Sequence, residues 1–106
     1  MNGLICSGGS VSNKVTVNTS GTKIITSNRH LKYIRISNIS DEYVTLAPVK
    51  ENAAGEVPVV FGEGIILAPK GTPGWFIEFN NTNMFYSDFW AITEKSDADL
   101  SILRGF

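Results

Sequence analysis

The chain has 106 residues, of which 42% are hydrophobic and 18% charged, and nine Lys and Arg against ten Asp and Glu give a net charge of −1. This length accommodates one domain with one hydrophobic core, and the composition is too apolar and too weakly charged for a disordered chain. The Lys residues are spread singly along the sequence. Because binding to phosphates needs a concentrated basic surface, the charge pattern argues against a nucleic-acid partner.

The cysteine content and the start of the chain bear on its cellular compartment. Cys6 is the only cysteine, so an internal disulfide cannot form and the fold does not need an oxidising environment. The first residues contain no basic stretch followed by an apolar run of signal-peptide length, and no later segment is apolar enough to predict a membrane helix. We therefore expect assembly in the cytoplasm and no membrane partner.

The first thirteen residues differ in composition from the rest. Six of them are Gly or Ser, a composition typical of a flexible arm, and Leu4 and Ile5 stand out as adjacent apolar residues within it. We expect an arm over residues 1–13 that orders on a partner subunit through Leu4 and Ile5, with the folded domain over residues 14–106. The alternative is that these two side chains cover the domain's own core.

After Lys14, β-branched residues occur in short runs separated by Gly, Asn, Ser, Asp and Pro, which is typical of strands. In the clearest run, alternation places Ile34, Ile36 and Asn38 on one face. Pro48 marks where the ladder of one strand weakens, and residues 50–58 predict a long loop that is a candidate contact loop. In chain order, the predicted strands are 15–18, 22–26, 31–36, 43–47, 65–67, 74–79, 84–85, 89–93 and 100–103.

Helical patterns are nearly absent, since no window of eleven residues shows a clean apolar helix face free of breakers. Eight or nine short strands with regular turn signals most economically form two packed antiparallel sheets. The predicted fold class is therefore all-β: a single antiparallel β-sandwich of Greek-key or jelly-roll type.

Residues for catalysis or metal binding are scarce. His30 is the single histidine, and together with Cys6 it provides too few ligands for a zinc or cupin-type site. A Ser-His-Asp or Cys-His arrangement would have to use the same His30. A glycosidase carboxylate pair remains formally possible, but most Asp and Glu residues lie in turn-like segments. We expect no enzyme activity, no catalytic residues, no metal and no cofactor.

Aromatic residues are concentrated in the second half of the chain. Seven fall within sixteen residues: Trp75, Phe76, Phe79, Phe85, Tyr86, Phe89 and Trp90. We interpret them as a core that continues into a subunit interface, and we expect a homo-oligomer, a dimer or a trimer. A row of exposed aromatics that stacks on sugars is the alternative. The candidate partner-binding residues are Leu4, Ile5, Trp75, Phe76, Phe85, Tyr86, Phe89 and Trp90.

Several short motifs together resemble a known group of proteins. They are Ile36-Ser-Asn38-Ile-Ser40-Asp41, Val44-Thr-Leu46, Gly64-Ile-Ile-Leu67-Ala-Pro69, Trp90-Ala-Ile92 and Leu100-Ser-Ile102. In this order they resemble the small β-sandwich proteins of tailed-bacteriophage virions, which decorate or cement capsids or serve as head fibres and tail modules. The resemblance runs from Val15 to Arg104 and departs from the pattern at residues 49–61 and 70–71.

This resemblance implies a role without catalysis. It implies a capsid decoration (cement) protein on the capsid exterior whose partner is the major capsid protein and which stabilises that lattice across its seams. A head-fibre or tail-associated adaptor from the same virion context is one alternative. A carbohydrate-binding or adhesion module, with a glycan as partner, is the other.

Overall fold

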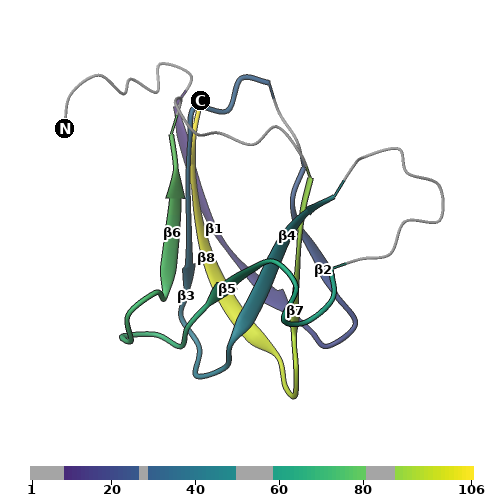
Figure 1. The fold of residues 1–106 in the computed structure, drawn as a ribbon. Coiled ribbons are helices and arrows are strands. Elements are labelled where there is room, and N and C mark those ends of the chain that lie inside the picture. The colour runs from purple at the N-terminus through teal and green to yellow at the C-terminus, as the bar shows by residue number, and fades with distance from the viewer. Residues whose placement is uncertain (1–8, 27–28, 50–58, 81–87) are drawn as a thin grey trace.

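The protein is an all-β sandwich, shown in Figure 1 as a computed structural model that describes residues 9–26, 29–49, 59–80 and 88–106. These residues contain no helix. The strands are β1 (Ser10–Val17), β2 (Thr22–Ile25), β3 (Tyr33–Asn38), β4 (Val44–Val49), β5 (Ile65–Leu67), β6 (Phe76–Phe79), β7 (Asp88–Thr93) and β8 (Ala98–Gly105). They form two four-stranded antiparallel sheets with the orders β1-β8-β3-β6 and β2-β7-β4-β5, which face each other.

The strand pairing has a nested order. The first strand pairs with the last, the second with the seventh, the third with the sixth and the fourth with the fifth. This is the pairing of one long antiparallel hairpin, and the additional pairs β3–β8 and β4–β7 roll that hairpin into two sheets. The arrangement is a jelly roll, which confirms the predicted fold class.

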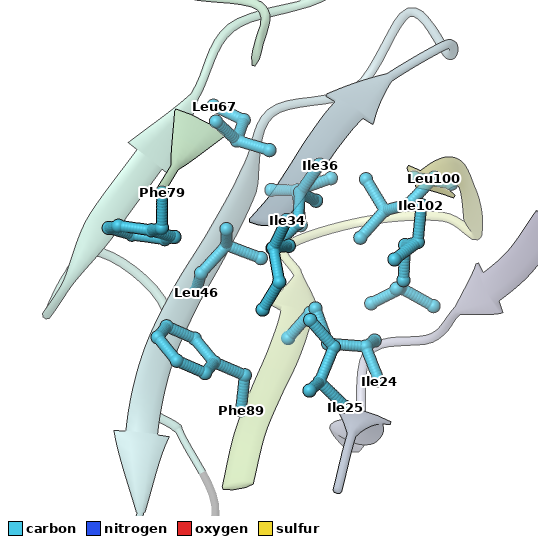
Figure 2. Close-up of a cluster of buried hydrophobic side chains, with 14 of the residues drawn as sticks. Ile24, Ile25, Ile34, Ile36, Leu46, Leu67, Phe79, Phe89, Leu100 and Ile102 are labelled. Atoms are coloured by element: carbon cyan, nitrogen blue, oxygen red, sulfur yellow. The ribbon is translucent and has the colours of Figure 1, made fainter. Parts of the chain in front are cut away.

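The core lies between the two sheets and follows from the alternation of apolar residues along the strands. In β8, Leu100 and Ile102 are buried while Ser101 between them is more exposed, as expected for a strand with one face on a core. Figure 2 shows side chains from both sheets meeting there. The labelled members are Ile24, Ile25, Ile34, Ile36, Leu46, Leu67, Phe79, Phe89, Leu100 and Ile102.

Asn38 is a buried polar residue that connects two turns. It is fully buried, and its Nδ2 donates to the carbonyl oxygens of Glu42 at 2.6 Å and Ala68 at 2.9 Å. Its Oδ1 accepts hydrogen bonds from the backbone nitrogen and the hydroxyl of Ser40 at 3.1 and 2.7 Å. One side chain therefore holds the β3–β4 turn against the residue that follows β5. The sequence pattern had placed Asn38 on the inward face, and that prediction is confirmed.

Most predicted strand boundaries differ from the structure by a few residues, and the differences in β1 and β4 have a clear structural reason. Strand β1 begins at Ser10, so residues 10–13 belong to the sheet and not to an arm, because they pair with β8 in an unbroken register. Strand β4 continues through Pro48, which lies opposite Phe89. The predicted strand 84–85, the predicted loop 50–58 and residues 1–8 lie outside the described residues.

The position of Pro48 has a simple geometric explanation. The carbonyl oxygen of Leu46 points toward β5, since it lies 2.3 Å from where a Cβ on Gly64 would be. Because backbone groups alternate sides along a strand, the nitrogen of Pro48 is directed to that same side. Pairing with β5 ends at Leu46, so the missing N–H of Pro48 costs no ladder hydrogen bond there.

Candidate protein-binding surfaces

The outer face of the β2-β7-β4-β5 sheet carries exposed apolar side chains. Ile66 lies opposite Thr45, which lies opposite Ile92, so all three share the face turned away from the core. Tyr43 immediately precedes β4 and has the same parity as Thr45. Tyr43 is 54% exposed and Ile66 is 50% exposed. Two large side chains, one within β5 and one just before β4, are therefore in contact with water.

A connecting segment folds over the same face. The backbone nitrogen of Gly62 donates to the Thr45 hydroxyl at 3.0 Å, which places residues 59–64 against the outside of β4. Val59 is buried but does not belong to the main core between the sheets, whereas its neighbour Val60 is 48% exposed. The segment therefore contributes Val60 to the exposed apolar surface. We call Tyr43, Val60 and Ile66, together with the half-buried Trp90 and Ile92, the outer patch.

A partly buried ion pair borders the outer patch. Lys23 lies opposite Trp90 in the β2–β7 ladder, and its Nζ is 2.9 Å from Oδ2 of Asp88. The Asp88 side chain is nearly inaccessible to water, while the Lys23 side chain is partly exposed. Nε1 of Trp90 is buried and has no hydrogen-bond partner among the described residues. On the β2 side, the outer patch is thus bordered by a charged pair.

The outer face of the other sheet is more polar. Phe76 is 39% exposed there, and the guanidinium of Arg35 lies over its ring, 4.3 Å from the centroid. The Trp75 ring packs edge-on against Phe76 with 5.5 Å between centroids. The Tyr33 hydroxyl donates to the Glu78 carboxylate on the neighbouring strand. The aromatic rings on this face are therefore engaged by cationic and aromatic neighbours of the same chain.

The structure separates the predicted partner-binding residues. Phe76 lies on the outer face of one sheet, with the Trp75 ring packed edge-on against it, and Trp90 lies on the outer face of the other sheet. Phe89 is 1% exposed and belongs to the core, so it has no surface to offer a partner. Leu4, Ile5, Phe85 and Tyr86 lie outside the described residues.

Sequence reasoning missed the main members of the outer patch. The run Ile65-Ile66-Leu67 contained a usable signal, because three consecutive apolar residues in one strand cannot all face the core. Ile65 and Leu67 are directed inward, which leaves Ile66 outside. Tyr43 also carried a usable signal, because it begins the predicted strand 43–47 with a parity opposite to that of Val44 and Leu46. Val60 lies outside the strands, where no alternation indicates a face.

The described residues contain no group of three or more His, Cys, Asp and Glu side chains that could hold a metal ion. His30 is an exposed residue of the β2–β3 connection. A search of the described residues for a helix long and apolar enough to cross a membrane finds none.

Comparisons with known proteins give the following. No family model matches the chain, and no curated protein matches it. A solved structure from Bacillus endospore appendages, described as disulfide-linked pili, aligns with a TM-score of 0.41 and 14% sequence identity over 99% of this chain and 97% of that chain. A likeness of this size assigns neither a family nor a function.

Proposed function

We propose that the chain is a non-catalytic structural protein that binds other protein subunits through the outer patch, and specifically that it decorates a bacteriophage capsid by binding the lattice of the major capsid protein. The observation that carries the proposal is the set of exposed apolar side chains at the outer face of this sheet: Ile66 within β5, Tyr43 just before β4 and Val60 in the segment that folds against β4. Exposed apolar groups on one face of a folded domain are typical of protein-binding sites.

The energetics suit a contact made many times in an assembly. Fully burying a large apolar side chain contributes about 1.5 to 3 kcal/mol, and these residues are half exposed, so each has part of that free energy still to gain. A single copy would bind its partner modestly. On a capsid lattice, a protein that binds only the intact lattice stabilises it by mass action. Each additional bound copy therefore raises the free energy needed to open the capsid.

The capsid assignment is the more specific part of the proposal, and the resemblance of the strand and turn motifs to phage β-sandwich proteins supports it. In this chain, the residues of those motifs form strands and turns. For example, Asn38 and Ser40 of the first motif form the hydrogen-bonded β3–β4 turn. Gly64, Leu67 and Pro69 of another motif enter and leave β5.

The test is to purify virus-sized particles from the source that encodes the chain and to quantify their proteins by mass spectrometry. A decoration protein occurs at a fixed ratio to the major shell protein and survives repeated density-gradient separation. Recovery of the chain only in the soluble fraction, or at a ratio that falls with each separation, would rule out the capsid assignment. Binding to glycans by soluble monomers would favour the carbohydrate-binding alternative.

A further inference from the structure

Strand β1 is an unusually complete sheet edge. It pairs with β8 over eight residues, from Ser10 opposite Gly105 to Val17 opposite Ala98, without a register shift. No described strand pairs with its other side. The other three edge strands are shorter, with four residues in β2 and β6 and three in β5, and β2 also has a register shift. Such shortening and irregularity are what normally prevent edge-to-edge association.

The direction of the backbone groups of β1 can be derived from two hydrogen bonds. The nitrogen of Phe106 donates to the oxygen of Gly9 at 3.0 Å, so the backbone of Gly9 faces β8. The nitrogen of Ile39 donates to the oxygen of Asp99 at 3.1 Å, which shows that the odd-numbered residues of β8 face β3. Because the directions alternate, the even-numbered residues of β1 direct their N–H and C=O groups to the open side. These are Ser10, Ser12, Lys14 and Thr16.

We propose that the open edge of β1 pairs with β1 of a second copy of this chain, antiparallel about a two-fold axis at Asn13, and joins two four-stranded sheets into one of eight strands. In this register Ser10 lies opposite the partner's Thr16, and Ser12 lies opposite the partner's Lys14. The four residues with free backbone groups then form four hydrogen-bonded pairs, each of which exchanges two hydrogen bonds. A two-fold axis makes the contact closed and self-complementary.

The side chains select this register over its neighbours. Moving the axis to Lys14 would place two lysines directly opposite each other, which is unfavourable. Moving it to Ser12 would leave Thr16 without a pairing partner within the strand. With the axis at Asn13, Val11 lies opposite the partner's Val15 on the inner face. Val11 is 45% exposed although it has the inward parity of the strand, so the second copy would cover it.

This surface differs from the outer patch, which lies on the other sheet, so the two proposals can fail separately. A contact made by one strand pair buries less area than the roughly 1,200 Å² of a stable complex. The dimer is therefore expected to be weak, with a dissociation constant on the order of tens of micromolar in isolation. Copies held side by side on a lattice would form it more readily.

Sedimentation equilibrium of the full chain between about 10 µM and 1 mM tests the proposal together with a proline variant. Wild type should shift from monomer to dimer over this range. Ser12→Pro removes an N–H that points to the open side of β1 and makes no hydrogen bond to β8. It should raise the dissociation constant of the dimer at least tenfold and leave cooperative thermal unfolding intact. Thr19→Pro, in the β1–β2 turn, is the matched control and should dimerise like wild type. A wild-type monomer at 1 mM, or unchanged dimerisation of Ser12→Pro, would overturn the proposal.

Cysteine cross-linking tests the register itself in a Cys6→Ser background. Two copies of Asn13→Cys would face each other across the axis in a non-hydrogen-bonded pair with Cα atoms about 4.5 Å apart, within reach of a disulfide. Ser10→Cys is the matched control, because its two copies would be about 20 Å apart, six residues along the strand. Air oxidation should convert Asn13→Cys into a covalent dimer and leave Ser10→Cys monomeric. Equal cross-linking of both variants would reject the two-fold axis at Asn13.

Discussion

At the scale of single residues, Gly64 is a position where the backbone leaves no room for a side chain. Its φ is +148°, and a Cβ would lie 2.3 Å from the carbonyl oxygen of Leu46. No small movement relieves this contact, because the oxygen belongs to the backbone of a central strand. The close approach of two backbones therefore fixes how the chain enters β5.

We expect Gly64→Ala to lower the free energy of unfolding by about 2 to 4 kcal/mol, because strain and overpacking add. Gly62→Ala is the matched control: its φ of +88° is also positive, but a Cβ there meets no atom within 4 Å. Gly62→Ala should lower the free energy of unfolding by about 1 to 2 kcal/mol. Urea denaturation measures both, and equal losses for the two variants would show that contact with Leu46 is not the cause.

Asn38 gives a second prediction at this scale. In Asn38→Asp the side chain keeps its shape but loses the two N–H donors that bind the carbonyls of Glu42 and Ala68. A carboxylate would then face two buried carbonyl oxygens. We expect a loss of about 3 kcal/mol or more in urea denaturation. Asn18→Asp should cost under about 0.5 kcal/mol, because exposed Asn18 uses its Oδ1 to accept from the Ser20 nitrogen, which a carboxylate also does. A similar loss in both variants would contradict the role given to Asn38.

At the scale of elements, the short strand β2 is held to β7 by a ladder with a register shift and by the Lys23–Asp88 ion pair. Lys23→Met would leave the buried Asp88 carboxylate without this cation. Because Lys23 itself is partly exposed, we expect a moderate loss of about 1 to 3 kcal/mol. Lys14→Met is the matched control, since its pair with Asp99 is 4.0 Å long and both side chains are well exposed. It should change the free energy of unfolding by less than about 0.5 kcal/mol. Thermal unfolding of the two variants in parallel measures both losses, and a loss in Lys14→Met as large as that in Lys23→Met would contradict the role given to the Lys23–Asp88 pair.

The strands also show which sequence signals are informative. In β3, alternation was sufficient to place Ile34, Ile36 and Asn38 inward, because both of its neighbours are strands and the other sheet covers one face. In β1, the residues Ser10, Ser12 and Asn13 looked like a flexible arm. They form a strand because β8 supplies the hydrogen bonds, and an edge strand whose side chains meet water needs no apolar alternation. Composition alone does not distinguish such an edge from a linker.

At the scale of the whole molecule, the jelly roll separates the two surfaces proposed for binding. The open edge of β1 ends one sheet, and the outer patch lies on the outward face of the other. The fold class was predictable, because strand length, turn residues and the lack of helical periodicity agree on a sandwich. The outer patch was not, because it depends on strands β4, β5 and β7 coming side by side, and the pairing of distant strands cannot be derived from local patterns.

The account rests on the proposal that the outer patch binds protein subunits, and the occupancy of an Ile66→Glu variant on the proposed capsid particles tests this most directly. Ile66 is half exposed, so a carboxylate there should leave the fold intact. Particles stripped of the chain are incubated with the purified variant, and bound copies are counted by mass spectrometry. Binding at least tenfold weaker than wild type, which corresponds to about 1.4 kcal/mol, is predicted. Ser96→Glu, the same charge in the exposed β7–β8 turn, should rebind like wild type. Full occupancy by a folded Ile66→Glu would contradict the account.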